Sequence, residues 1–258
     1  MKTVCDAEEI KEFAFKEGVD LVGIANVDIF PTSVPSRTPQ GLLAGAKSVI
    51  VYGISMLLGS ISSNPRVAVS HTKTVYDELN RISYRIGRLV ERKGYRAATV
   101  GSFFPLEMSK ETKGLVGDLS FRHAAVAAGL GVWSRCRLVL NPRWGPRVRY
   151  AATVTDAPLP TDSPLKESLC TDCDLCIRVC PVGALSTDGT VDTLKCLLQL
   201  QQYGQPGLAR FLRSLVAKPI EEQQQAIREP LFWNLYQHLA MGIDYECSRC
   251  LEVCPVGL

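Results

Sequence analysis

The stretch CTDCDLCIRVCP, residues 170–181, places four cysteines within twelve positions and ends on a proline. Disulfides fit this density poorly, because each bridge needs two Cα atoms about 4.4 to 6.8 Å apart with suitably directed side chains. Disulfide frameworks also belong to short secreted chains. This chain instead opens MKTVCDAEEIKEF, with acidic residues where a secretory signal would be apolar. The thiols therefore indicate metal binding.

The spacing of these cysteines, two, two and then three residues apart before a proline, is the run found in bacterial ferredoxins with two [4Fe–4S] clusters. Three cysteines of such a run bind one cluster and the fourth binds the other, so a second run is required. CSRCLEVCP at 247–255 supplies it. Zinc also accepts C-x2-C pairs, but two interlocking runs suit a tetrahedral zinc site poorly. The pattern therefore predicts two iron–sulfur clusters.

Two clusters need eight cysteines, and the two runs contain seven. Cys196 is the natural eighth ligand, because the remaining thiols, Cys5 and Cys136, both lie in the amino-terminal half. We therefore predict one cluster on Cys170, Cys173, Cys176 and Cys254. The second cluster is predicted on Cys180, Cys196, Cys247 and Cys250.

The composition bounds the size of the protein and its possible partners. A chain of 258 residues with 46% hydrophobic content can bury one sizeable core and carry a small appended module. Its formal charge of +3 is nearly balanced, which makes nucleic acid an unlikely partner. No apolar run reaches the roughly 18 residues of a membrane span, and no twin-arginine signal precedes the chain. We expect no membrane association and a cytoplasmic location.

Hydrophobic periodicity divides the chain into two parts. Residues 1–162 are expected to form an α/β domain with strands at 20–27, 48–56 and 95–100, and helices beginning at Asp6 and spanning 74–93 and 119–131. RLVL and RVRYAATVT are expected to pair as strands around NPRWGP. The proline-rich APLPTDSP marks a boundary, after which residues 163–258 are expected to form the cluster domain with a helical insertion at 197–246.

Several stretches together resemble the epoxyqueuosine reductase family and the related reductive dehalogenases. They are AKSVIVYGISM, HAAVAAGLG, GPRVRYAATVTDAPL, both cysteine runs and VDTLKC. The resemblance implies an α+β protein: a nitroreductase-like domain that holds cobalamin, then a ferredoxin-like double-cluster module that passes electrons to cobalt. Members that act on tRNA continue into a helical-repeat domain after the last CP motif. Because this sequence ends at Leu258, we expect it to be a short form without that tRNA platform.

The resemblance also suggests a proton donor. Family members carry an aspartate ahead of AGLG, and counting back without gaps reaches Leu115 in this chain. Asp118 is the nearest carboxylate and is therefore the candidate catalytic acid, unless proton donation is not a role of this protein.

Further candidates surround the glycine turn and the basic stretch that follows it. Gly129, Leu130 and Gly131 would let backbone approach a flat cofactor, although a helix stop explains Gly129 equally well. Arg147 and Arg149 suit the phosphate of a corrinoid tail, or else lie on an exposed strand face. Cys136 lies between these groups and is either a contact to cobalt or substrate, or a small buried hydrophobe.

These features favour a cobalamin-dependent iron–sulfur reductase that takes electrons from a low-potential donor and reduces a small substrate. One alternative is a non-catalytic electron carrier that reduces a corrinoid or flavin on a partner redox protein. FMN in the pocket is a weaker alternative, because fold analogy alone supports it. A tRNA epoxyqueuosine reductase remains possible if another subunit supplies the RNA platform.

Overall fold

The computed structural model describes residues 5–30, 37–103, 109–110, 116–241 and 247–258. Its centre is a four-stranded sheet in the order β1-β2-β6-β3, in which all neighbours are antiparallel. The strands are β1 (Leu21–Asn26), β2 (Ser48–Ser55), β3 (Ala97–Thr99) and β6 (Val148–Thr155). β2 and β6 pair along their whole length, from Ser48↔Thr155 to Ser55↔Val148. Both are apolar, almost entirely buried strands, and so they occupy the middle of the sheet.

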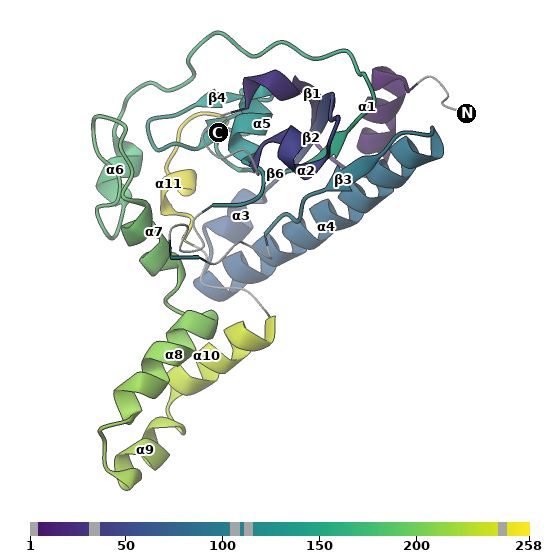
Figure 1. Cartoon of the computed structure of the whole chain (residues 1–258). Helices are drawn as coiled ribbons and strands as arrows, with labels where there is room; N and C mark the ends of the chain where they lie inside the picture. The colour runs from purple at the N-terminus through teal and green to yellow at the C-terminus, as the bar shows by residue number, and fades with distance from the viewer. Residues whose placement is uncertain (1–4, 31–36, 104–108, 111–115, 242–246) are drawn as a thin grey trace.

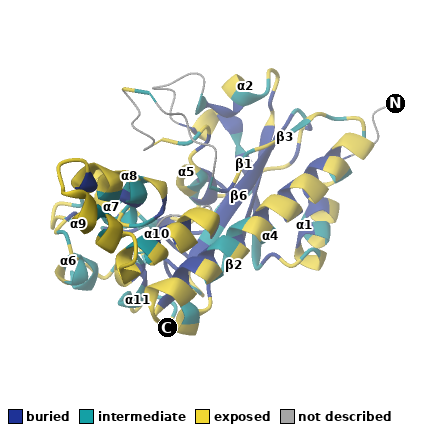
Figure 2. Cartoon of the chain, turned by 90° about the horizontal axis from the view of Figure 1, so that it is seen from below, coloured by how far each residue is buried: buried dark blue, intermediate teal, exposed yellow. Residues whose placement is uncertain are grey.

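Helices cover both faces of this sheet (Figures 1 and 2). α1 (Ala7–Lys16) and α4 (Pro65–Arg92) cover one face, where Ile10, Leu79 and Ile86 are fully buried. Tyr52 lies in the same layer, and its hydroxyl is 2.6 Å from Ser83 Oγ. α5 (Phe121–Ala127) covers the other face with small residues that permit close packing. The result is a three-layer domain.

The long helix α4 begins nine residues earlier than its apolar stripe predicted. Asn64 is its N-cap, and its side-chain oxygen accepts from the backbone N–H groups of Arg66 and Val67 at 3.1 and 3.2 Å. Pro65 then occupies the first helical position, where its missing N–H has no cost. The start of α4 is therefore set by Asn64 and Pro65 and not by the apolar stripe. No helix in the described ranges is long and apolar enough to cross a membrane.

The predicted strand pair around NPRWGP is wrong. β5 (Val139–Leu140) pairs with β4 (Val132–Trp133), whereas β6 joins the central sheet. Asn141 closes the intervening turn, because its Oδ1 accepts from the N–H groups of Arg143 at 2.9 Å and Trp144 at 3.2 Å. This local turn directs the chain from one sheet to the other.

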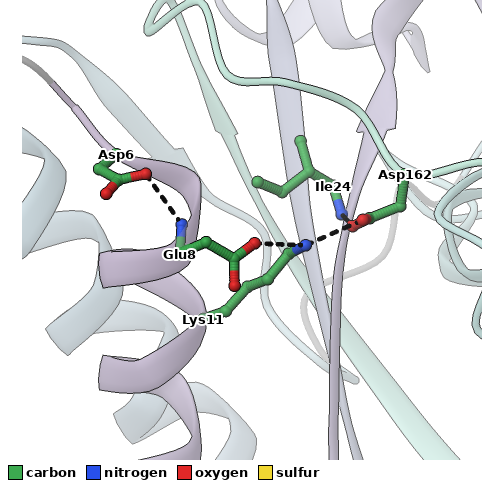
Figure 3. A network of polar contacts seen from close by, with 5 residues as sticks. All are labelled: Asp6, Glu8, Lys11, Ile24 and Asp162. Atoms are coloured by element: carbon green, nitrogen blue, oxygen red, sulfur yellow. Dashed lines mark hydrogen bonds and ion pairs between the residues drawn. The ribbon is translucent and has the colours of Figure 1, made fainter.

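The chain leaves the sheet through a fixed point at Asp162 (Figure 3). Its carboxylate accepts from Lys11 Nζ and from the N–H of Ile24, each at 2.8 Å. Its own N–H donates to the carbonyl oxygen of Ile24 at 2.8 Å. At the start of α1, Asp6 Oδ1 accepts from the N–H of Glu8, whose carboxylate is 3.3 Å from Lys11 Nζ. The predicted domain boundary after residue 162 falls at this anchor.

The second part of the chain is helical. α6 (Leu175–Val179) contacts α11 (Arg249–Glu252), and α7 (Thr193–Leu200) leads to a hairpin that projects from the body (Figure 1). In this hairpin, α8 (Gly204–Leu215) packs against α10 (Pro230–Met241), and the short α9 (Ile220–Ala226) lies between them in the sequence. It is mostly exposed, with Leu215 and Leu235 buried inside (Figure 2). Short helices η1 (Val27–Ile29), α2 (Pro39–Leu42) and α3 (Leu58–Ile61) complete the described elements.

Candidate iron–sulfur and cofactor site

A narrow cavity of about 30 Å³ lies between the β4–β5 hairpin and the first cysteine run. Six thiols line it: Cys136, Cys170, Cys173, Cys176, Cys250 and Cys254. All four thiols of the first predicted ligand set are among them, together with Cys250 from the second set. All ten cysteines lie in the described ranges, and none forms a disulfide. This donor set fits a thiolate-bound iron–sulfur cluster.

The first run folds around the cavity because two aspartates adopt left-handed backbone conformations. Asp172 has φ 52° and Asp174 has φ 59°, a region that aspartate tolerates better than most residues. Arg135, from the β4–β5 hairpin, binds both carboxylates: its Nη2 is 3.1 Å from Asp172, and its Nη1 bonds Asp174. The amino-terminal domain thus clamps the loop that carries three predicted ligands.

The second run is held by Arg147, which is only 3% exposed. Its guanidinium donates to the carbonyl oxygens of Leu251 at 3.0 Å, Cys254 at 3.1 Å and Val256 at 2.6 Å. The predicted role as a ligand of a corrinoid phosphate is therefore corrected, because these carbonyl groups use the guanidinium. Arg147 is a positioning residue for the cluster segment.

Burial shapes the chemistry of the cavity thiols. It raises the pKa of Cys176 to about 11, and it also raises the pKa of Cys250 and of Cys254 above the usual range. These thiols therefore hold protons near neutral pH, and iron must displace them on binding. Within the described part of the chain, no three His, Cys, Asp or Glu side chains converge closely enough for a single ion. A cubane cluster spreads its ligands over four corners instead.

Three thiols of the second predicted set share one neighbourhood. The charges of Cys247 and Cys196 add to burial in raising the pKa of Cys250. Cys196 lies on α7 and Cys250 on α11, so thiols from both sides of the helical insertion are within electrostatic range of each other. Cys180 follows α6, and its sulfur accepts from the N–H of Ala184 at 3.2 Å. Such N–H···S bonds are typical of cluster thiolates.

The glycine turn after α5 packs against protein rather than an open face. Gly129 has φ +70°, and a Cβ there would lie 2.4 Å from the carbonyl oxygen of Ser163. A Cβ at Gly131 would lie 2.5 Å from the carbonyl oxygen of Leu140, and Leu130 is 7% exposed in the core. Backbone contacts within the chain therefore explain these glycines, which corrects their prediction as a cradle for a flat cofactor.

A group of polar and aromatic side chains lies instead beside the first half of α4. The Arg149 guanidinium is 5.8 Å from the ring centre of Tyr76, which stacks on Phe103 at 5.1 Å. Thr72 lies one turn before Tyr76, and Ser102 precedes Phe103. In the described ranges, the hydroxyls of Thr72 and Ser102 are buried without a hydrogen-bond partner. Such orphaned groups fit a bound polar ligand.

Arg122 is influenced electrostatically by both Arg149 and the thiols. Its pKa is lowered by burial, while the charges of Cys196 and Cys136 raise it and that of Arg149 lowers it. It therefore lies within electrostatic range of both regions. His71, at the same end of α4, accepts a hydrogen bond from the N–H of Leu57 at 3.0 Å. Burial and the charge of Arg149 lower the pKa of His71.

Asp118 is exposed, in the bend just before Ser120, the N-cap of α5. Leu115, the position reached by the gapless count, lies outside the described residues. The structure thus leaves Asp118 as a candidate on the surface.

Sequence reasoning missed the clamp role of Arg135 and the orphaned hydroxyls. The two aspartates between the cysteines were a usable signal for a cationic partner. No local pattern distinguishes Thr72 or Ser102 from other hydroxyl residues.

Comparison with known proteins agrees with this architecture. Residues 164–186 match the model of the 4Fe-4S binding domain. The epoxyqueuosine reductase of Escherichia coli K12 is 32% identical over 276 residues, covering 95% of this chain and 70% of that protein. This chain belongs to the epoxyqueuosine reductase family. It nevertheless spans only 44% of the Bacillus anthracis relative and 55% of the Bacillus subtilis relative.

Solved structures confirm the predicted fold class of this family member. Epoxyqueuosine reductase from Bacillus subtilis has a TM-score of 0.64 at 21% identity, covering 97% of this chain and 64% of that chain. A catabolic reductive dehalogenase in complex with 3-bromo-4-hydroxybenzoic acid has a TM-score of 0.61 at 24% identity, covering 75% of this chain and 29% of that one. A further structure of similar fold contains an epoxyqueuosine-modified tRNA stem loop. The prediction against a nucleic-acid partner is therefore not supported.

Proposed function

We propose that this chain is an oxidoreductase that carries electrons through two [4Fe–4S] clusters to a bound corrinoid, where a substrate is reduced. The observation that carries the proposal is the convergence of Cys170, Cys173, Cys176 and Cys254 on one cavity. Membership of the epoxyqueuosine reductase family supports it. A solved dehalogenase of similar fold is described as B12-dependent, which supports the corrinoid.

The chain's own residues hold the clusters and leave each open to an electron donor. When bound, the clusters would supply low-potential electron transfer, and cobalamin a reducible cobalt centre. Arg135 and Arg147 fix the two cysteine runs against the sheet domain. Cys173 and Cys196, one from each predicted set, are exposed. A low-potential donor protein can therefore approach either set.

We propose that the corrinoid binds beside the group of side chains around Thr72, Ser102 and Arg149. Corrinoids carry many amide side chains, and the buried hydroxyls of Thr72 and Ser102 can bond to such groups. Arg149 would contact an amide or the phosphate of the nucleotide tail. Arg122 places a positive charge within electrostatic range of both Arg149 and Cys196. Asp118 would hold the proton that a reduced substrate takes up.

Family membership favours epoxyqueuosine in tRNA as the substrate. A small organic molecule is the second candidate, because the dehalogenase of similar fold is solved with a bromohydroxybenzoic acid. Incubating the loaded protein with each substrate class separates the two.

Cobalamin titration of the reconstituted protein tests the proposed corrinoid site. We expect one cobalamin per chain, and Thr72→Val and Arg149→Gln should each weaken binding by roughly fivefold, since a hydrogen bond contributes about 1 kcal/mol. The exposed Thr187→Val is the matched control and should bind like wild type. Unaltered cobalamin binding by both variants would reject this site. Absence of binding by the wild type would favour a non-catalytic electron carrier.

A further inference from the structure

Arg137, in the turn between β4 and β5, has a backbone conformation that arginine rarely adopts. Its φ is 58°, and the other non-glycine residues with positive φ in the described ranges are both aspartates. The turn closes through backbone atoms: the N–H of Arg137 donates to the carbonyl oxygen of Ser134 at 3.0 Å, and its own carbonyl oxygen accepts from Arg122 at 2.9 Å. Glycine could make both of these bonds without the steric cost, so the arginine side chain requires a separate explanation.

The side chain of Arg137 reaches the second part of the chain. Its Nε donates to the carbonyl oxygen of Gly189 at 3.0 Å, across 52 residues of sequence. Gly189 has φ +80° and lies in a tight turn that is closed by an antiparallel bridge between Leu185 and Val191. The contact therefore joins the β4–β5 turn to the segment 184–192.

The segment 184–192 connects two predicted ligands of the second cluster, Cys180 and Cys196. At its start, the N–H of Ala184 donates to Cys180 Sγ at 3.2 Å. The two ends of the segment are paired, because the N–H of Asp192 donates to the carbonyl oxygen of Ala184 at 2.8 Å. Asp192 is also the N-cap of α7, the helix that carries Cys196. A displacement of this segment would therefore move both thiols.

We propose that Arg137 is a positioning residue for the second cluster: its bond to Gly189 fixes the segment 184–192 and thereby holds Cys180 and Cys196 in place. This rests on the proposed cluster assignment. Without the guanidinium, the bonds within the segment persist, but the segment loses this tie to the sheet domain. The left-handed backbone of Arg137 fits such a role, because sparsely populated conformations cluster at functional sites where the surrounding structure holds them.

The same turn also holds the first cysteine run. Arg135, two residues before Arg137, binds the carboxylates of Asp172 and Asp174. One turn of the sheet domain thus contacts a segment of each predicted ligand set. The two arginines should therefore have separable effects, with Arg135 acting on the first cluster and Arg137 on the second.

Iron release to a chelator from the anaerobically reconstituted protein, together with EPR of the reduced clusters, tests the proposal. Arg137→Gly removes the guanidinium and also the steric cost of the positive φ, so the turn itself can form as well as in the wild type. This variant should release half of its iron roughly three- to tenfold faster than the wild type and lose the EPR signal of one cluster first, since a hydrogen bond contributes about that factor. Arg137→Lys keeps the steric cost and a cationic donor, and should release iron more slowly than Arg137→Gly.

Arg135→Met is the matched variant for the first ligand set. It should speed the release of the other half of the iron, with loss of the other EPR signal. The double variant, Arg135→Met with Arg137→Gly, should release both halves faster than the wild type.

Three results would overturn the proposal. If Arg137→Gly retains iron as long as Arg137→Lys or longer, Arg137 serves only the conformation of the turn. If Arg135→Met and Arg137→Gly release the same half of the iron, the two arginines do not hold separate ligand sets. Failure of the wild type to bind two clusters would overturn the cluster assignment itself, and that result is visible before any variant is made.

Discussion

Replacing Arg147 by methionine tests how the sheet domain holds the second cysteine run. The variant keeps most of the apolar stem and removes three hydrogen bonds, to the carbonyl oxygens of Leu251, Cys254 and Val256. A bond from a charged donor contributes about 1.5 to 3 kcal/mol, and disrupting a buried charged contact costs about 3 to 5 kcal/mol in total. We expect the free energy of unfolding to fall by about 3 to 5 kcal/mol, which is less than the sum of three such bonds, because water can reach the freed carbonyl groups.

The loss of stability should appear first as opening of the carboxy-terminal segment that carries the second cysteine run. A cost of about 3 to 5 kcal/mol raises the population of an open state roughly a hundredfold to several thousandfold. Anaerobic urea unfolding and the rate of iron loss to a chelator measure this for the reconstituted protein. Arg143→Met is the matched control, since Arg143 lies in the same turn, is exposed, and stacks on Trp144 at 4.7 Å. Equal urea midpoints and equal rates of iron loss in the two variants would refute the reasoning.

Three further predictions concern the glycine turn, the candidate acid Asp118 and the half-buried His71. Gly129→Ala should lower the urea midpoint more than Gly18→Ala, because both have positive φ but only Gly129 meets backbone, at 2.4 Å; equal losses would contradict that contact. Asp118→Asn should abolish turnover while the cluster and corrin spectra persist, and full activity would remove Asp118 from the mechanism. The lowered pKa of His71 means that the unfolded chain binds the proton more tightly. Stability should therefore rise with pH up to about 6.5, and His71→Gln should flatten that rise if His71 causes it.

Much of the fold could be predicted because its determinants are local. The buried runs at 20–27 and 48–56 became β1 and β2, and the stripe from residue 74 became most of α4. Cys170, Cys173 and Cys176 lie within seven residues and share one cavity, which Cys136 and Cys250 also line. Only Cys254 had to be inferred from the crossed ligand pattern of two-cluster ferredoxins.

Two of the failures share a physical cause, which is dependence on contacts distant in sequence, and the third depends on a local turn closed by a side chain. The acceptors of Arg147 lie 104 to 109 residues further along the chain, so its basic neighbours suggested an anion instead. The space beside Gly129 is filled by Ser163, from the linker after the sheet. The pairing of β5 with β4 depended on the turn at Asn141, whose side-chain bonds no hydrophobic pattern reveals.

The measurement that tests the central claim most directly is anaerobic reconstitution with iron and sulfide, followed by cobalamin titration with visible and EPR spectra. We predict two [4Fe–4S] clusters per chain and one bound cobalamin whose cobalt is reduced only when the clusters are present. Two clusters without any bound corrinoid, or a cobalt that the reduced clusters cannot reach, would contradict the assignment of this chain as a corrinoid-dependent reductase.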